Sequence, residues 1–527
     1  MNNYKKITKV WNIIFLVCLV IILITGIFLK TFALYHSGNL FVDEGYLLSN
    51  IMERNYFDLF LPLNEWQCCP PMFLILGKML YSRYGFDNFV LRILPYTFSV
   101  LSVIFFTFLS FKTINNKLGI LLSISALSLS EACIMFQMYF KQYSSDAFFT
   151  IFVLLLAILL KDKKLSKLEL FGLAILSCLV VFFSYTAGFL IVCVIIALLD
   201  KNIEGSKSNK EIKEKIKPFL CYIVPFSLIM TVFFFVNCWP TRNSDVLQDF
   251  WTDTYVFLPH NLFEIKTLVK FLVNPFSKIY PSLLIFAVTF FLLRKKDKYL
   301  WEILFLPFAI AIIFGYFKLY PLAHERVSTY LIPIFILILF KSIDFISFKN
   351  KVLSLFLISL VFFNINYQNV IDQYVKIFKG ESLSIINDYK YIFKFKKEPI
   401  SPIFFKGDCL YPLEIHRVTL FPEFLEILEH SDITENDYYV RDNLSFWAIA
   451  DKKYSKVKIN DKMRIFDGAG IFDKLYSIPK DSFVYFYLSQ EYHIMYRQLK
   501  DWINKNCIVI YNVECYNGEF IKCKKIR

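Results

Sequence analysis

Long apolar stretches recur through the first two thirds of the chain, and short polar segments separate them. A helix that rises about 1.5 Å per residue needs roughly 20 such residues to cross the hydrocarbon layer of a bilayer. The pattern predicts a polytopic all-α membrane protein with about eleven transmembrane helices. We place these spans at residues 11–32, 89–111, 118–136, 147–160, 168–183, 186–200, 218–237, 279–294, 302–319, 327–341 and 350–367.

Two regions depart from this pattern. Residues 70–84 are apolar for only part of their length and contain Lys78 and Arg83, which predicts a helix that lies in the membrane interface. From residue 368 onward charges become frequent and apolar runs are short, which predicts a soluble α/β domain. We expect its elements at 481–489 (strand), 492–506 (amphipathic helix), 508–515 (strand) and 519–526 (strand). The chain therefore divides into a transmembrane domain, 1–367, and an α/β domain, 368–527.

Composition agrees with lipid as the main solvent. Of the 527 residues, 57% are hydrophobic and 19% are charged, and the mean hydropathy is +0.50, which excludes an ordinary soluble protein. The net charge of +14 does not indicate nucleic-acid binding, because much of the basic excess lies in short loops between apolar stretches. The first stretch is about 22 residues long and lacks a small-residue cleavage site, which indicates a retained anchor. The abundance of Phe, Ile, Lys and Asn is typical of an AT-rich bacterial genome.

The distribution of basic residues predicts the topology. With the N-terminus in the cytoplasm, the inner loops contain Lys112 and Lys117; Lys161, Lys163, Lys164 and Lys167; the lysines from Lys201 to Lys217; Arg294, Lys295, Lys296 and Lys298; and Lys341, Lys349 and Lys351. The opposite loops have little basic excess, as the positive-inside rule expects of the outer face. These loops are 33–88, 137–146, 238–278 and 320–326, with a tight turn near Ser184 and Tyr185. An odd number of crossings leaves residues 368–527 outside the plasma membrane.

The predicted outer domain contains cysteines. They are Cys409, Cys507, Cys515 and Cys523. An oxidising compartment would allow them to form disulfides, and their pairing is open at this stage.

The first candidate site residues are Asp43 and Glu44, which open the first outer loop. Adjacent carboxylates at a membrane boundary are costly to desolvate, which favours a functional role. A solvated loop start or a helix cap explains them equally well.

The second candidate cluster ends the next outer loop, where Asp146 directly precedes the fourth span and Lys141 lies in the same loop. This position of Asp146 is typical of a helix cap. A carboxylate of an active site is the alternative.

The third cluster, His324, Glu325 and Arg326, interrupts apolar sequence between the ninth and tenth spans. Arginine offers a planar fork of donors that a phosphate group accepts in pairs. The simpler alternative is that Arg326 reaches to the interface, with Glu325 as a local partner.

All three clusters fall on the same predicted side of the membrane. Two carboxylate sites and a cationic site on one face are what sugar transfer from a lipid phosphate requires. One carboxylate takes the proton of the acceptor hydroxyl, and cations hold the departing phosphate. A transporter or flippase of lipid-linked saccharides is an alternative, but such proteins tend to show inverted repeats and charges near the midplane. We find no internal repeat in the sequence.

Several motifs occur in a recognisable order. They are DE (Asp43, Glu44), PP (Pro70, Pro71), an R-L-P pattern (Arg92, Leu94, Pro95), SSDAFF, FSYTAGFLI and YPLAHERVSTYLIP. Their order resembles the GT-C superfamily, specifically the protein O-mannosyltransferases and the aminoarabinose transferases of lipid A. The resemblance covers about residues 10–200 and, more loosely, 300–345. The tail resembles the extracytoplasmic α/β domain of many bacterial members.

The resemblance implies a GT-C fold and an inverting membrane glycosyltransferase. Its donor would be a polyprenyl-phosphate-linked sugar, and its acceptor a cell-surface glycan, lipid or protein. It further implies that Asp43 is the catalytic base, that Glu44 and Asp146 belong to the site, and that Arg326 binds phosphate.

The chain departs from the family in one respect. The aminoarabinose transferases have a lysine just before the proline, where this chain has Cys69. Lys141, Lys78 and His324 are the candidates for a replacement cation. The sequence contains no DxD motif, and no cofactor is predicted, although Asp43, Glu44 and Asp146 could converge on a divalent metal. An inactive homologue whose tail binds surface glycan is a further alternative.

Overall fold

The computed structural model divides the chain into two compact units. The first, which we call the membrane unit, comprises Met1–His36, Asn50–Arg83 and Phe89–Phe378, and the second, the tail unit, comprises Ser37–Ser49, Tyr84–Asn88 and Lys379–Arg527. The main division thus follows residue 378, whereas the sequence predicted it after residue 367. The structure describes residues 2–36, 42–64, 67–85, 88–243, 247, 251, 280–321, 326–345, 403–406, 438–440, 475–476, 478–489, 494–515 and 518–527.

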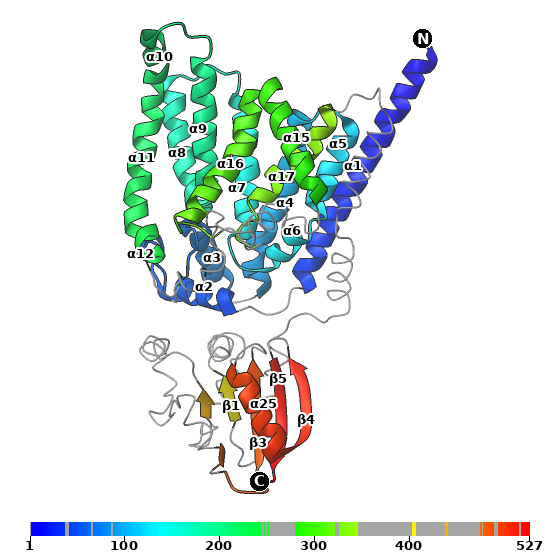
Figure 1. Cartoon of the computed structure of the whole chain (residues 1–527), viewed down its shortest axis with the longest axis vertical. Helices are drawn as coiled ribbons and strands as arrows, with labels where there is room; N and C mark the ends of the chain where they lie inside the picture. The colour runs from blue at the N-terminus through cyan, green and yellow to red at the C-terminus, as the bar shows by residue number, and fades with distance from the viewer. Residues whose placement is uncertain are drawn as a thin grey trace. The chain divides into compact units, whose positions relative to one another are not determined.

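Helices form the described part of the membrane unit (Figure 1). The helices up to residue 345 are α1 (Asn2–His36), α2 (Val42–Glu53), η1 (Asp58–Phe60), α3 (Pro71–Tyr84), α4 (Asn88–Thr113), α5 (Lys117–Ser128), α6 (Glu131–Met135), η2 (Phe136–Met138), α7 (Tyr143–Leu160), α8 (Lys167–Phe183), α9 (Ala187–Ile203), α10 (Asn209–Ile216), η3 (Lys217–Phe219), α11 (Leu220–Phe233), the π-helical η4 (Phe234–Cys238), α12 (Trp239–Arg242), α15 (Tyr280–Lys296), α16 (Lys298–Tyr316), α17 (Leu331–Lys341) and η7 (Ser342–Phe345). Every predicted span coincides at least in part with a described helix, except 350–367, which lies outside the described residues.

Among the residues that the structure describes, five helical segments are long and apolar enough to cross a membrane. They are Val10–Tyr35, Phe89–Thr113, Tyr143–Leu160, Asn209–Arg242 and Lys298–Tyr316. Shorter apolar helices pack against them: α8 contacts α11, α9 contacts α16, and α15 contacts α16. The chain is therefore a multi-pass membrane protein, as its apolar pattern predicted.

Polar side chains fix several helix starts. The Asn116 side chain accepts hydrogen bonds from the backbone N–H groups of Leu118 and Gly119 at the start of α5. Ser166 and Glu169 form a reciprocal capping box at the start of α8. These caps satisfy backbone donors that a helix leaves unpaired in its first turn.

The prediction of one helix over 118–136 is wrong. α5 ends at Ser128, and α6 begins at Glu131. The Ser130 hydroxyl accepts a hydrogen bond from the backbone N–H of Cys133 at 3.4 Å, which is how serine starts a new helix in place of continuing the old one. The predicted span at 327–341 is also shortened, because residues 326–330 form turns and α17 begins at Leu331.

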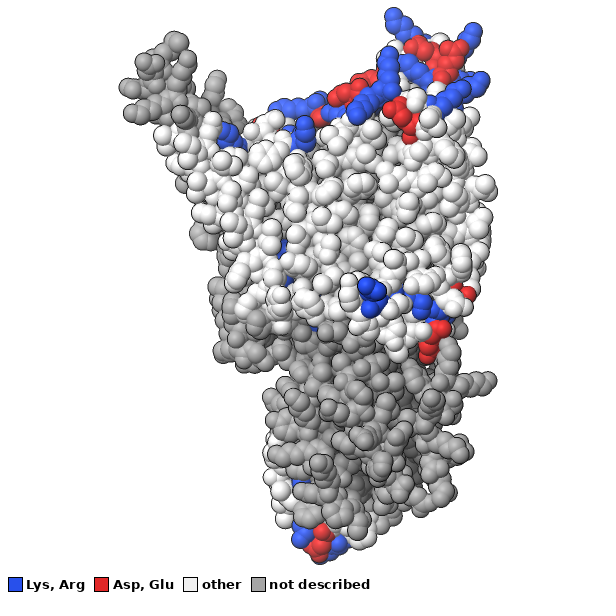
Figure 2. All heavy atoms as spheres, turned by 180° about the vertical axis from the view of Figure 1, so that it is seen from behind, with Lys and Arg blue, Asp and Glu red and all other residues white. Residues whose placement is uncertain are grey.

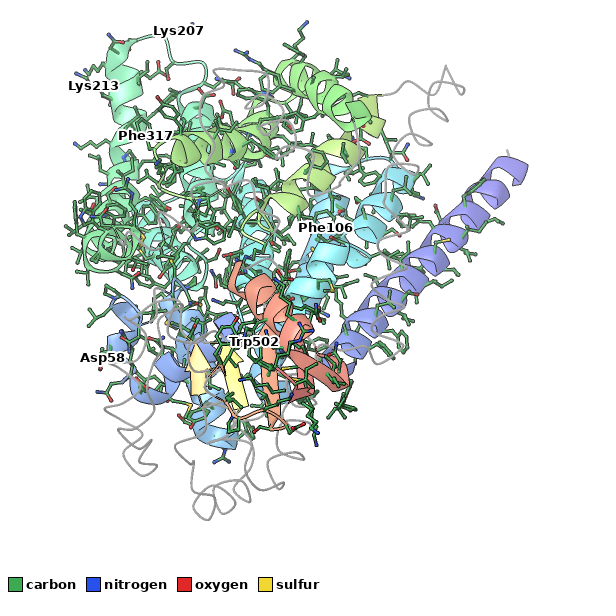
Figure 3. The ribbon with its side chains drawn as sticks, turned by 60° about the horizontal axis from the view of Figure 1, so that its bottom comes forward. Asp58, Phe106, Lys207, Lys213, Phe317 and Trp502 are labelled. Carbon is green, nitrogen blue, oxygen red and sulfur yellow. The ribbon has the colours of Figure 1, made fainter. Side chains whose placement is uncertain are left out.

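Charged side chains gather at one end of the membrane unit, and an uncharged band adjoins them (Figure 2). Ion pairs link helix ends there, between Lys161 and Asp297 at 2.7 Å and between Lys298 and Asp200 at 2.5 Å. Lys207 and Lys213 lie at this same end, beside and on α10 (Figure 3). The predicted inner loops therefore share one end of the bundle, whereas α3 and α12 lie at the other end (Figure 1).

We expect Asp344→Ala to lower the free energy of unfolding by about 2–3 kcal/mol. The Asp344 carboxylate accepts hydrogen bonds from the backbone N–H groups of Asn115 and Asn116, both at 2.9 Å, and from Lys341 Nζ at 2.8 Å. Its side chain is only 5% exposed, so its loss leaves the two backbone donors without this acceptor, whereas Lys341 keeps its hydrogen bond to the Thr113 carbonyl. Thermal or denaturant unfolding in detergent measures the effect.

Asp162→Ala is the matched control for this prediction. Asp162 pairs with Lys201, but its side chain is 83% exposed, and exposed ion pairs contribute little to stability. Equal unfolding midpoints for the two variants would contradict the role given to Asp344.

Apart from the residues before position 89, the described part of the tail unit is a small sheet covered by one helix. Its elements are β1 (Ile403–Lys406), β2 (Tyr438–Val440), β3 (Phe483–Ser489), α25 (Ile494–Asn506), β4 (Cys507–Cys515) and β5 (Gly518–Lys525). The strand order is β2-β1-β3-β5-β4. β1 is parallel to β2 and β3, whereas β5 is antiparallel to β3 and β4. The structure confirms the predicted strands and helix between residues 481 and 526 and adds β1 and β2.

The core of this sheet lies under α25. Leu499, Trp502 and Ile503 from the helix share a buried cluster with Val484 and Phe486 from β3. The rings of Trp502 and Phe486 are 6.2 Å apart, and Trp502 is labelled in Figure 3. The apolar face of this amphipathic helix thus packs against the sheet.

Candidate active site

The segment before α3 is held from several sides. Lys141 Nζ donates a hydrogen bond to Gln67 Oε1 at 2.5 Å, and Gln142 Nε2 donates to the Cys68 carbonyl at 3.3 Å. The Tyr185 hydroxyl donates to the Cys69 carbonyl at 3.0 Å. The loop that carries Lys141 is therefore fixed against the residues that directly precede the predicted interfacial helix.

Lys141 brings a cation to the segment before α3. Its hydrogen-bond acceptor Gln67 lies two residues before Cys69. Lys141 is only 6% exposed, and its described hydrogen-bond acceptor is neutral. A buried ammonium group at a membrane boundary has a strong electrostatic preference for an anion.

Asp146 is buried in the first turn of α7. It is 3% exposed, and its Oδ1 accepts a hydrogen bond from Ser184 Oγ at 2.5 Å. Ser184 Oγ also lies 3.1 Å from Thr186 Oγ1. Gln142, not Asp146, occupies the N-cap position of α7. The interpretation of Asp146 as a helix cap is therefore wrong, and the carboxylate is instead held by the polar turn between α8 and α9.

This turn also connects distant segments of the site. The Tyr185 hydroxyl lies 3.1 Å from Asn237 Oδ1, and Asn237 Nδ2 donates to the Phe60 carbonyl at 2.9 Å. Asn237 is part of the π-helical segment η4, a helix form that is often found at functional sites. One hydroxyl thus joins the end of α11 to the segment before α3.

Electrostatic effects show that Lys141 and Asp146 act on the same segment. Burial raises the pKa of the Cys69 thiol well above its ordinary value; the charge of Lys141 opposes this shift, and the charge of Asp146 adds to it. Both groups therefore lie close enough to Cys69 to influence its ionisation. A cation and a carboxylate therefore both act on the residue before Pro70.

A second connection leads from Asp146 toward Arg326. Burial raises the pKa of the Tyr320 phenol, and the charge of Asp146 reinforces the shift. The Tyr320 hydroxyl donates to the carbonyl of Val327, the residue after Arg326, at 3.0 Å. The Arg326 guanidinium lies 5.4 Å from the centre of the Trp251 ring, which orients it by a cation–π contact.

The remaining candidates have varied placements. Asp43 and Glu44 lie in the first turn of α2, where carboxylates interact favourably with the helix dipole. Glu44 is fully buried. The side chain of Asp43 lies outside the described residues, as do His324 and Glu325.

Lys78 donates to the Ile51 carbonyl and lies over the Tyr56 ring at 5.6 Å, so it binds the end of α2.

Sequence reasoning missed a buried lysine in the first span. Lys30 is 1% exposed and donates to Ser99 Oγ at 2.7 Å and to the Cys133 carbonyl at 3.3 Å. Its own carbonyl accepts a hydrogen bond from Gln137 Nε2 at 3.0 Å. α1 therefore holds the beginning of the loop that carries Lys141. A charged residue inside an apolar span was the available signal.

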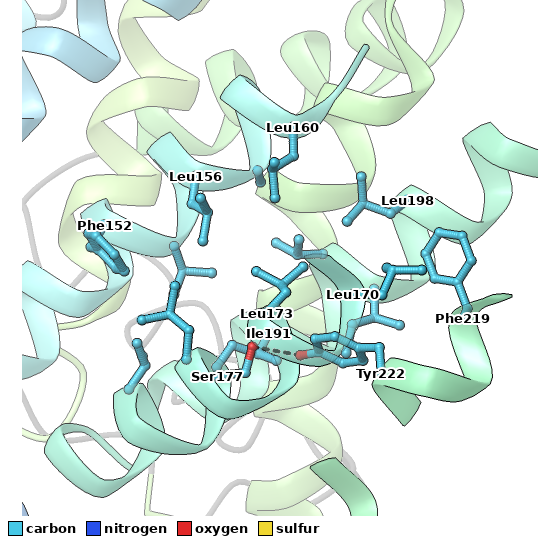
Figure 4. A pocket seen from close by; sticks show the side chains of 16 residues that line it. Phe152, Leu156, Leu160, Leu170, Leu173, Ser177, Ile191, Leu198, Phe219 and Tyr222 are labelled. Carbon is cyan, nitrogen blue, oxygen red and sulfur yellow. Dashed lines mark hydrogen bonds between the residues drawn. The ribbon is translucent and has the colours of Figure 1, made fainter. Parts of the chain in front are cut away.

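The described residues contain no metal cluster, and a cavity among four of the described helices is not lined by the site residues. Within the described residues, no group of three or more His, Cys, Asp or Glu side chains is placed to hold a metal ion, so the divalent metal stays a prediction that involves Asp43. A cavity of about 30 Å³ lies between α7, α8, α9 and α11 (Figure 4). Apolar side chains line most of it, and the Tyr222 hydroxyl there donates to Ser177 Oγ at 2.7 Å. It is a packing gap among helices, and neither Asp146 nor Lys141 lines it.

We expect Tyr185→Phe to loosen the segment before α3. Loss of the hydroxyl leaves the Cys69 carbonyl and Asn237 without this donor, which costs about 1–2 kcal/mol. Cys69 is only 2% exposed, so a maleimide can label it only when this segment opens. A loss of this size should raise the population of the open segment, and with it the labelling rate, by about 5- to 30-fold. Mass spectrometry of the labelled peptide measures the rate.

Tyr222→Phe is the control for this measurement. It also removes a buried hydroxyl, but from the contact between Tyr222 and Ser177. An equal acceleration of Cys69 labelling in both variants would show that general destabilisation, and not the Tyr185 hydroxyl, controls access to this segment.

Comparison with known proteins adds two structural similarities. The sequence matches no protein-family model and no curated protein. Two solved structures are similar along nearly the whole chain. Both are ArnT from Cupriavidus metallidurans. The apo form has a TM-score of 0.49 and covers 98% of each chain, and the form bound to undecaprenyl phosphate has a TM-score of 0.45 and covers 97% of this chain and 98% of that one. At 11% identity and TM-scores below 0.5, the functional conclusion rests on this chain's own residues.

Proposed function

We propose that this protein is an inverting membrane glycosyltransferase of the GT-C type. It transfers a sugar from a polyprenyl-phosphate donor to a glycan, lipid or protein acceptor at the outer face of the plasma membrane. The observation that carries this proposal is that buried Lys141 donates a hydrogen bond to the segment before α3 and that the charge of buried Asp146 acts on the same segment. We assign the ammonium group to a phosphate and the carboxylate to a sugar or its acceptor.

Lys141 and Arg326 are the proposed phosphate ligands. Lys141 is nearly excluded from solvent, so its attraction for an anion is weakly screened. Arg326 presents a planar guanidinium that can give two parallel hydrogen bonds to a phosphate. Its orientation is supported by the Trp251 ring and by the hydrogen bond of Thr329 Oγ1 to the Arg326 carbonyl at 2.7 Å.

The proposed reaction is a single displacement at the anomeric carbon. Asp43 takes the proton of the acceptor hydroxyl while its oxygen attacks that carbon from the side opposite the phosphate. The bond between the anomeric carbon and the phosphate oxygen breaks, and its electron pair leaves with the phosphate. Lys141 and Arg326 neutralise the departing group, which needs no proton at neutral pH. We assign Glu44 and Asp146 to the same reaction as further carboxylates, as the order of the sequence motifs implies.

The proposal places the chain in the membrane with its N-terminus in the cytoplasm. The lysine-rich end that contains α10 then faces the cytoplasm, and the end that contains α3 faces outward. We assign residues 368–527 to the outside on the same grounds. A cell-envelope acceptor would meet the site from that side.

A transfer assay tests the proposed function. Purified full-length protein in nanodiscs is incubated with a panel of radiolabelled polyprenyl-phosphate sugars and with membrane extract as the source of acceptor. We expect one donor to pass its label to an extract component. Label that crosses a sealed vesicle membrane on an intact lipid would support a flippase, and bound lipid with neither transfer nor transport would support an inactive homologue.

A further inference from the structure

Two cysteines of the tail unit face the same side of neighbouring strands. In the antiparallel pair β4 and β5, Val509 lies opposite Cys523, and Cys507 lies opposite Lys525. Side chains two residues apart along a strand point to the same face. Cys507 and Cys523 are therefore diagonal neighbours across the ladder, on one face of the sheet.

Their side chains meet in the core of this unit. Cys523 is fully buried and Cys507 is 7% exposed, and both belong to the cluster formed by Val484, Phe486 and Trp502. Each thiol affects the pKa of the other, which agrees with their positions as neighbours in this core. Cys523 Sγ also donates to the Val484 carbonyl at 3.6 Å. Two cysteines on the same face of paired strands and within one buried core are placed to bridge those strands.

A buried lysine makes the pair asymmetric. Lys525 is 3% exposed, and its Nζ donates to the carbonyls of Leu475, Tyr476 and Ile478 at 2.6–2.9 Å. The neighbouring Cys523 thiol lowers the pKa of the Cys507 thiol, and the charge of Lys525 acts in the same direction. A lowered pKa favours the thiolate, the form that attacks a disulfide. Cys507 is thus suited to react first and Cys523 to complete the bond.

We propose that Cys507 and Cys523 form a disulfide in the cell, which staples the β4–β5 hairpin. The proposal depends on the outer location assigned to the tail, because thiols stay reduced in the cytoplasm. It is independent of the sugar chemistry. The oxidant is a disulfide of a thiol oxidoreductase that acts once the β4–β5 ladder has paired and while its inner face is still accessible.

The exchange proceeds in two balanced steps. The Cys507 thiolate attacks one sulfur of the oxidant's disulfide, forms a mixed disulfide and releases the oxidant's other thiolate. The Cys523 thiolate then attacks the Cys507 sulfur and displaces the second thiolate of the oxidant. Two electrons pass to the oxidant, which becomes a dithiol and takes up the two protons of Cys507 and Cys523.

Differential thiol labelling of the full-length protein tests this pair. Cells are quenched in acid, and free thiols are alkylated with N-ethylmaleimide under denaturing conditions before reduction and labelling with iodoacetamide. We expect Cys507 and Cys523 to carry the second label, and the unreduced digest to contain a peptide that links them. Cys178 and Cys193, buried in α8 and α9, are the controls and should carry the first label. Cys507 and Cys523 both carrying the first label would overturn the proposal.

The variant Cys507→Ser verifies the partner. With Cys507 absent, Cys523 should move completely from the second label to the first. If Cys523 kept the second label, its partner would be Cys409 or Cys515, and the assigned pair would be wrong. Accessibility of an engineered tag after residue 527 in intact cells establishes the location of the tail separately, and the transfer assay establishes the enzyme separately.

Discussion

Replacing Asp43 with asparagine is expected to reduce sugar transfer by about 10²- to 10⁴-fold, the usual contribution of a general base. The amide keeps the shape of the side chain but cannot take the proton of the acceptor hydroxyl. Both Asp43 and Glu44 lie in the first turn of α2, so the substitution leaves the helix itself intact. The measurement is the initial rate of label transfer at saturating donor, normalised to the amount of monodisperse protein.

Glu44→Gln provides the comparison for this variant. The two carboxylates are adjacent in sequence, so effects on the helix N-terminus should be similar, and a difference in rate reports the base. Undiminished transfer by Asp43→Asn would contradict its assigned role and would direct the search to Glu44 and Asp146.

Replacing Lys141 with methionine should lower transfer by about 10²- to 10³-fold, as expected when one donor to a developing oxyanion is lost. Methionine preserves much of the buried stem and removes the ammonium group. Gln67 then loses its donor, but it can reorient toward solvent because it is only partly buried. Rates measured over a range of donor concentrations separate weaker donor binding from slower chemistry.

Lys78→Met distinguishes the two lysine candidates. Lys78 belongs to α3, the helix that follows the segment bound by Lys141. Its ammonium group contacts the Ile51 carbonyl and the Tyr56 ring. We expect a much smaller loss of transfer from this variant. A large loss in Lys78→Met with normal activity in Lys141→Met would reverse the assignment of the phosphate ligand.

The helices were predictable because apolar composition and length suffice to define a span. The same reasoning failed where a few polar residues acted locally. The Ser130 hydroxyl starts α6 and breaks the helix predicted over 118–136, and summed hydropathy across a window does not register one hydrogen bond. β1 and β2 were missed for another reason: each has only a few residues, and they pair with partners distant in sequence.

The site was predictable as a set of residues but not as a geometry. Asp146 and Lys141 stood out because charges in apolar surroundings are costly. The contact between Lys141 and Gln67 depends on how two loops fold together, and no local pattern encodes it. Ser184, by contrast, left a readable signal. Ser, Tyr and Thr follow one another between two apolar helices, where their hydroxyl groups need hydrogen-bond partners. In the structure the Ser184 hydroxyl donates to Asp146.

Release of the lipid carrier tests the central claim most directly. Purified wild-type protein is mixed with a polyprenyl-phosphate sugar labelled in the phosphate, together with acceptor, and the lipid products are separated by chromatography. The account predicts free polyprenyl monophosphate in equal amount to the sugar transferred, with loss of both in Asp43→Asn. Donor that stays intact while it is bound or moved across the membrane would contradict it.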